Sequence, residues 1–137
     1  MEIGPYLNFN GQCAAAFKAY ERILGGSIST MLTYGESPMA EQFPEMRQAV
    51  LHATLTIGDR VLMGADAPPN QYDEPKGFAV SLALNDPAEA ERVFKSLSEN
   101  GTVRMPLQKT FWSPAFGMLV DQYGIPWMIN CEEGRRA

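Results

Sequence analysis

The sequence repeats one pattern of secondary structure, and this repeat restricts the fold more than any other feature. In the first half, an apolar strand at residues 5–9 is followed by a helix at residues 12–24. In the second half, a strand at residues 79–84 is followed by a helix from residue 87 to about residue 99. Further strands complete each half. The repeat therefore predicts two βαβββ modules.

The repeat also sets the domain organisation. We expect one domain, residues 1–137, of the α+β class, with module one at 3–66 and module two at 77–131. The proline-rich segment 67–76 is predicted to link them. The two modules should form curved sheets, resembling incomplete barrels, with helices on their outer faces. The other, more mixed face must then line a second sheet, a subunit interface or a cavity.

Alternating side chains predict which strand face each helix covers. Leu7 and Phe9 should pack under the first helix, and Leu82 and Leu84 under the second. The polar stretch at residues 35–47 is expected to be a long loop whose role the sequence does not indicate.

Turn and capping signals mark the ends of the helices. Asp86-Pro87 is a start signal for the second helix, and Asn10 is expected to cap the first. Gly25-Gly26 and Gly101 are predicted to be left-handed stops. Three carboxylates at loops or strand ends are expected to be solvated: Glu36, Asp66 and Asp121.

Composition excludes several classes of partner. The chain is 45% hydrophobic and 20% charged with a net charge of −5, and it has no run of Lys or Arg, so we expect neither nucleic acid nor a membrane surface as partner. No apolar stretch has membrane-spanning length, and residues 1–5 lack the features of a signal peptide. Cys13 and Cys131 show no metal-ligand spacing. We therefore expect a cytoplasmic protein with reduced thiols.

Four segments resemble those of one known family: residues 5–11, 17–26, 52–59 and above all 117–130, which end in Trp127-Met128-Ile129-Asn130. On these segments the chain is similar to the PhnB-like branch of the vicinal oxygen chelate superfamily, which also includes glyoxalase I, extradiol dioxygenases and bleomycin- and fosfomycin-resistance proteins. The resemblance implies paired βαβββ modules around a cleft, usually in a homodimer.

The resemblance also implies where a metal would bind in the catalytic members. Carried onto this chain, the four ligand positions fall at Gly4, Met63, Ala79 and Met128, and none suits a hard divalent cation. A register shift of one residue gives Pro5, Gly64, Val80 and Ile129, which are no better. We therefore expect no metal and no cofactor.

Some relatives are labelled as a ubiquinone-related methyltransferase, which the residues do not support. A common methyltransferase needs a glycine-rich turn between a strand and a helix to hold its cofactor. The Gly25-Gly26 pair follows a helix instead of preceding one.

A ligand would have to contact the strand face that the helices leave free. His52 is the single histidine and lies in phase with Thr54 on a predicted strand. Aromatic and thioether side chains, which suit small-molecule clefts, concentrate in module two. No residue is assigned a catalytic role. The candidate ligand-binding residues are Tyr6, Asn8, His52, Met63, Trp112, Met118 and Met128.

Three functions follow as hypotheses. The first is a metal-free, homodimeric glyoxalase-fold protein that binds a small apolar or aromatic molecule. The alternative is a metal-dependent lyase, isomerase or dioxygenase with atypical ligands, such as His52 with Asp66 or Glu36. The third is a module that serves only protein–protein contacts.

Overall fold

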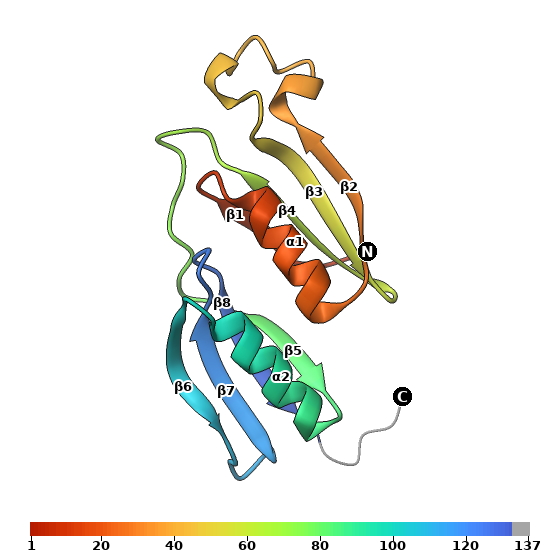
Figure 1. Ribbon diagram of the computed structural model, residues 1–137, viewed down its shortest axis with the longest axis vertical. Helices are drawn as coiled ribbons and strands as arrows, with labels where there is room; N and C mark the ends of the chain where they lie inside the picture. Colours follow the sequence, from red (N-terminus) through yellow and green to blue (C-terminus); the bar gives the residue numbers. More distant parts are fainter. Residues whose placement is uncertain (133–137) are drawn as a thin grey trace. The chain divides into compact units, whose positions relative to one another are not determined.

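The computed structural model describes residues 1–132, and these form two compact units, Met1–Asp73 and a second that begins at Glu74. Each unit contains one long helix and one four-stranded sheet, and the helix lies against one face of its own sheet (Figure 1). The predicted α+β fold with two βαβββ repeats is confirmed. Neither sheet closes into a barrel, since each has two edge strands.

The first unit has the strand order β1-β4-β3-β2. Strand β1 runs parallel to β4, and the other pairs are antiparallel. The segment at residues 35–47, which was predicted to be a long loop, contains η2 and most of η1, two short 3₁₀ helices. The elements are β1 (Tyr6–Phe9), α1 (Cys13–Leu24), β2 (Ser27–Thr33), η1 (Tyr34–Glu36), η2 (Pro44–Met46), β3 (Val50–Ile57) and β4 (Arg60–Asp66).

The second unit has the equivalent strand order β5-β8-β7-β6, with β5 parallel to β8. Its first edge strand after the helix, β6, is the one element whose bounds the sequence did not indicate. The elements are β5 (Val80–Leu84), α2 (Pro87–Ser98), β6 (Thr102–Gln108), β7 (Ala115–Val120) and β8 (Pro126–Cys131).

The core of each unit lies between its helix and its sheet, as the alternation predicted. Leu7 and Phe9 are fully buried, and the ring of Phe9 meets that of Phe17 edge-on at 6.0 Å between centroids. Leu82 and Leu84 of β5 are only half-buried, although their counterparts on the equivalent edge strand β1 are fully buried. The buried residues of the two helices are Cys13, Ala16, Phe17, Ala19, Tyr20 and Ile23 of α1, and Ala90, Val93, Phe94 and Leu97 of α2.

Two predictions about the helix ends are wrong, the Asn10 cap of α1 and the left-handed Gly101 after α2. Asp86 caps α2 as expected, accepting from the amide of Ala88 at 3.1 Å. Asn10 does not cap α1; instead Asp66 Oδ1, from the end of β4, accepts the amide of Cys13 at 2.9 Å. The residue with positive φ after α2 is Asn100, at 59°, and not Gly101. Gly101 is required for another reason, since a Cβ there would lie 2.4 Å from the carbonyl oxygen of Val120.

Two of the three carboxylates expected at the surface are buried. Asp66 is 2% exposed and Asp121 is 5% exposed, whereas Glu36 is exposed as expected. Asp66 also accepts the amide of Val50 at 2.9 Å. Asp121 accepts the backbone amides of Tyr123 and Ile125 and the indole N–H of Trp127. These donors replace water, which is why both carboxylates are buried without a cationic partner in these bonds.

Candidate functional site

Strand register shows which side chains share the face that α1 does not cover. Tyr6 pairs with Met63, and Met63 pairs in turn with Thr54. Direct cross-strand partners point to the same side of a sheet. This side is opposite Leu7 and Phe9, which pack on α1. We call it the first open face, and its central residues are Tyr6, Asn8, His52, Thr54 and Met63.

The same construction defines the second open face. A row of thioethers crosses the sheet, because Met105 pairs with Met118 and Met118 pairs with Met128. The neighbouring row contains Phe116 opposite Asn130. The ring of Trp112 meets that of Phe116 edge-on at 5.2 Å. We define the second open face by Met105, Trp112, Phe116, Met118, Met128 and Asn130.

His52 is held at both ring nitrogens on the first open face. The Tyr6 hydroxyl lies 3.2 Å from Nδ1, and the Thr54 hydroxyl lies 3.0 Å from Nε2. In a neutral imidazole one of these nitrogens donates and the other accepts. The Tyr6 ring also stacks beside the imidazole at 5.8 Å. This arrangement fixes the ring and offers a ligand a short polar chain beside the Met63 thioether.

The Tyr6 phenol is a hydrogen-bonding group and not an activated nucleophile. Partial burial, and secondarily the charge of the Cys13 thiolate form, raise the pKa of Tyr6 above its ordinary value of 10.0. The phenol therefore stays protonated at neutral pH and can donate as well as accept.

The second open face is the more apolar of the two. Trp112 is 54% exposed, and its ring also meets that of Phe111 edge-on at 4.8 Å. One buried polar atom of this surface has no hydrogen-bond partner among residues 1–132, the side-chain oxygen of Asn130. Such an atom is unusual in a folded protein and calls for a donor. The face thus combines flat aromatic surface, deformable thioethers and one unsatisfied acceptor.

The predicted ligand-binding residues divide between the two units. In the first unit, Tyr6 contacts His52 and pairs with Met63, and Asn8 follows on the same face of β1. In the second, Met118 and Met128 are direct partners. Trp112 lies against Phe116, one row along from them.

Three residues of the second open face were missing from the predicted site. Phe116 and Asn130 are adjacent in register, which only the pairing of β7 with β8 reveals. Met105 lies on β6, where Pro106 interrupts the strand pattern in the sequence. Proline is tolerated there because β6 is an edge strand. The apolar residues at every second position, Val103, Met105 and Leu107, were the available signal for this strand.

The residues at the expected metal positions do not fit a hard divalent cation. Met63 and Met128 face Tyr6 and Ser81 across the parallel strand pairs, and thioethers are soft ligands. The carboxylate of Asp66 binds amides on the α1 side of the sheet, opposite His52, and that of Glu36 binds Thr33. Residues 1–132 contain no group of three His, Cys, Asp or Glu side chains arranged to hold a metal.

The two βαβββ units define the class of fold found in glyoxalases, bleomycin-resistance proteins and dioxygenases. A protein of that description from Nocardioides superposes with a TM-score of 0.55 at 18% identity, over 99% of this chain and 87% of its own, a likeness of fold alone. Within this class the chain belongs to the PhnB-like family, whose model, described as 3-demethylubiquinone-9 3-methyltransferase, matches residues 1–130.

Individual relatives agree with this assignment. Protein YjdN of Escherichia coli K12 is 35% identical over 141 residues, covering 95% of each chain. The crystal structure of PA1353 from Pseudomonas aeruginosa is 44% identical with a TM-score of 0.90, over 97% of this chain and 98% of its own. The PhnB protein of Bacillus cereus is 25% identical with a TM-score of 0.81, over 96% and 99%. Among residues 1–132, no helix has the length and apolar character needed to cross a membrane.

Proposed function

We propose that this protein binds a small apolar or aromatic molecule on its open faces, without a metal, as a homodimer in the cytoplasm. The observation that carries the proposal is the second open face. There an exposed tryptophan, thioethers and one unsatisfied acceptor lie together on the sheet face opposite the helix. Apolar walls with a few polar groups are what small-molecule sites require. The first open face, in the other unit, has a polar group of its own for a ligand bound there, the hydrogen-bonded His52.

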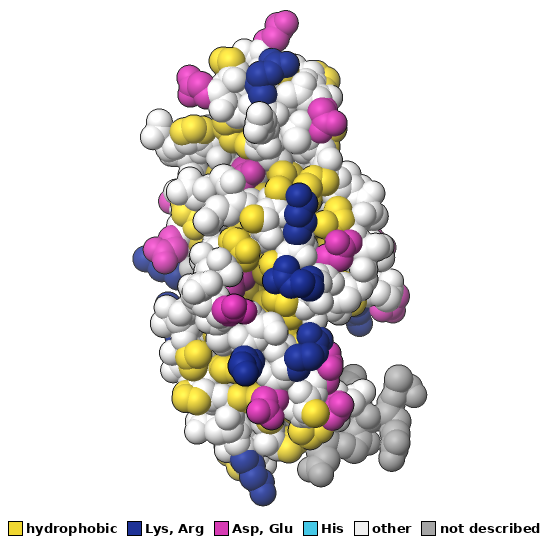
Figure 2. Space-filling view, viewed as in Figure 1, with side chains coloured by type: hydrophobic (Ala, Val, Ile, Leu, Met, Phe, Trp, Pro, Cys, Tyr) yellow, Lys and Arg dark blue, Asp and Glu magenta, His cyan; other side chains and the backbone are white. Residues whose placement is uncertain are grey.

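Charge supports a small molecule over nucleic acid. The net charge is −5, and acidic side chains lie among the Lys and Arg side chains on the face viewed in Figure 2. Phosphate backbones are bound by continuous basic surface. The compartment is proposed from the cysteines, because Cys13 and Cys131 are both buried thiols and do not form a disulfide.

Binding is favoured over methyl transfer as the primary role. Each sheet has one parallel strand pair and is otherwise antiparallel. The common methyltransferase cofactor site is built at the carboxyl ends of a parallel sheet, next to a glycine-rich turn. The family's description therefore gives a name whose chemistry this architecture does not support.

A thermal-shift screen of aromatic compounds on protein dialysed against EDTA tests the proposal. Hits should stabilise wild-type protein, by ~2.7 kcal/mol at a hundred times the dissociation constant. Trp112→Ala should abolish the shift. Val103→Ala, which removes an exposed apolar side chain from the opposite face of the same sheet, should retain it. Compounds that bind only after a divalent metal is added back would contradict metal-free binding.

The two tryptophans should differ sharply in their effect on stability. Trp112 is 54% exposed, whereas Trp127 is 1% exposed and donates its indole N–H to Asp121. Trp127→Ala should therefore lower the free energy of unfolding by about 3–5 kcal/mol, and Trp112→Ala by about 1 kcal/mol or less. Urea denaturation measures both. A loss at Trp112 as large as that at Trp127 would make Trp112 a core residue and not a ligand contact.

The homodimer is proposed because both sheets have exposed edges and a helix-free face. Light scattering at micromolar concentration should give twice the chain mass of 15.1 kDa. A single species at 15.1 kDa would exclude it.

A further inference from the structure

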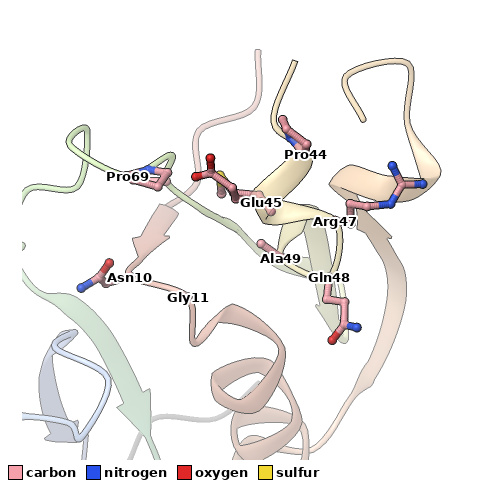
Figure 3. Close-up of a pocket in the computed structure, with 10 residues that line it drawn as sticks. Asn10, Gly11, Pro44, Glu45, Arg47, Gln48, Ala49 and Pro69 are labelled. Atoms are coloured by element: carbon pink, nitrogen blue, oxygen red, sulfur yellow. The ribbon is translucent and has the colours of Figure 1, made fainter. Parts of the chain in front are cut away.

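The first unit contains a hollow that is distinct from the open faces. Its volume is about 530 Å³, within the range of small-molecule sites. It lies at the carboxyl ends of β1 and β4, between the Asn10-Gly11 turn, η2 and the segment that follows β4 (Figure 3). Its lining residues are Asn10, Gly11, Pro44, Glu45, Met46, Arg47, Gln48, Ala49, Ala67 and Pro69.

The walls of the hollow are held in place by hydrogen bonds. On the loop side, the amide of Tyr34 donates to the carbonyl oxygen of Ala49, and the amide of Gly35 donates to the carbonyl oxygen of Arg47. The Tyr34 hydroxyl donates to the carbonyl oxygen of Asp66 at 2.9 Å, which fastens the loop to the end of β4. On the other side, the amide of Ala67 donates to Phe9. These bonds fasten the ends of the loop at residues 35–47, which therefore forms a fixed wall of the hollow.

The charges around the hollow favour a cation. Glu45 and Pro69 lie on one side and Asn10 and Gly11 on the other, whereas the Arg47 side chain extends away from them (Figure 3). Arg47 is the one cationic residue of the lining. A second carboxylate, that of Asp66, is buried beside Ala67 and is bonded only to neutral amides in the contacts described above. An anion would be repelled by both carboxylates, and an ammonium group attracted.

The remaining polar groups suit hydroxyls. The side chains of Asn10, Glu45 and Gln48 have no partner among residues 1–132. An amide both donates and accepts, as a hydroxyl does. The Gln48 side chain, like that of Arg47, points away from Glu45 (Figure 3). We propose that this hollow is a second binding site, for a small hydroxylated amine, with Glu45 binding the ammonium group and Asn10 binding a hydroxyl.

Amide NMR titration with D-glucosamine tests the site. Glucosamine at concentrations on the order of 10 mM should shift the amide signals of Gly11, Gln48 and Ala49, because single exposed charge pairs bind weakly. D-glucose and N-acetyl-D-glucosamine, which lack the charged amine, should shift them at least about fivefold less. Equal shifts with all three sugars, or shifts confined to other residues, would overturn the proposal.

Matched variants of the protein provide a second test in the same titration. Glu45→Gln should weaken glucosamine binding at least about fivefold, since it removes one charge-assisted bond. Glu41→Gln makes the same charge change at an exposed position of the same loop outside the hollow, and should leave binding unchanged. Loss of binding in both variants, or in neither, would contradict the assignment of Glu45. Trp112→Ala should not affect this titration, because Trp112 does not line the hollow. A negative result with glucosamine would therefore leave the proposal for the open faces standing, and the reverse also holds.

Discussion

At the scale of the residue, one buried carboxylate in each unit accepts several hydrogen bonds. Asp66 links the start of α1 to the start of β3 by accepting the amides of Cys13 and Val50. Asp121 closes the turn between β7 and β8 and also receives the indole N–H of Trp127. Each carboxylate accepts hydrogen bonds from donors that would otherwise be buried without partners. Leaving such a donor unpaired costs more free energy than the hydrogen bond itself contributes.

The Cys13 thiol, which adjoins one of these carboxylates, predicts how stability depends on pH. Burial, and secondarily the charge of Asp66, raise the pKa of Cys13 from 9.0 to about 12. As pH rises above 9.0, the thiol ionises in the unfolded chain but not in the folded one. Unfolding then releases a proton, so stability falls with rising pH, by at most about 1.4 kcal/mol per pH unit from this group.

Urea denaturation at several pH values between about 8 and 11 measures this effect. Wild-type protein should lose more stability over that range than Cys13→Ala, because the tyrosine contributions are common to both. Parallel pH dependences would show that Cys13 does not ionise differently on folding.

The residue scale is also where sequence patterns were least informative. His52 was placed on the correct strand face by its phase with Thr54 alone. Asp66 and Asp121 were misjudged because their partners are mostly backbone amides, which every residue carries and no pattern marks. The hollow beside Glu45 was missed for a related reason, since its walls come from three separate loops.

At the scale of elements, close packing of helix on sheet depends on one glycine in the first unit. A Cβ at Gly64 of β4 would lie 2.8 Å from the carbonyl oxygen of Leu7 and 2.9 Å from the Phe17 ring. Helix α1 can lie this close to β4 only because that side chain is absent. Helix periodicity and caps predicted where the helices lie, whereas β6 was not delimited because it contains Pro106, a residue that is rare in strands.

Gly64→Ala should therefore lower the free energy of unfolding by about 1–3 kcal/mol, as overpacked core substitutions do. Gly4→Ala is the matched control, because its Cβ would meet nothing closer than 3.7 Å. Chemical denaturation of both variants makes the comparison. Equal stability of the two would mean that α1 moves away from β4 without cost.

At the scale of the whole molecule, one unit occurs twice with the same strand order but with different chemistry on its open face. The first open face carries the polar chain of Tyr6, His52 and Thr54. The second carries thioethers and aromatic rings. Duplication was evident from the sequence because each copy repeats its own helix and turn signals. The difference between the faces depends on register, which becomes certain only once the strands are paired.

Methyl NMR of protein labelled at its methionine methyl groups tests binding on the open faces most directly. Met118 and Met128 report on the second open face, Met63 on the first, and Met31 on the side that α1 covers. With EDTA present, aromatic hits from the screen should shift the signals of Met118 and Met128 and leave Met31 unchanged. Shifts at Met31 alone, or shifts that require an added divalent metal, would contradict metal-free binding on the open faces.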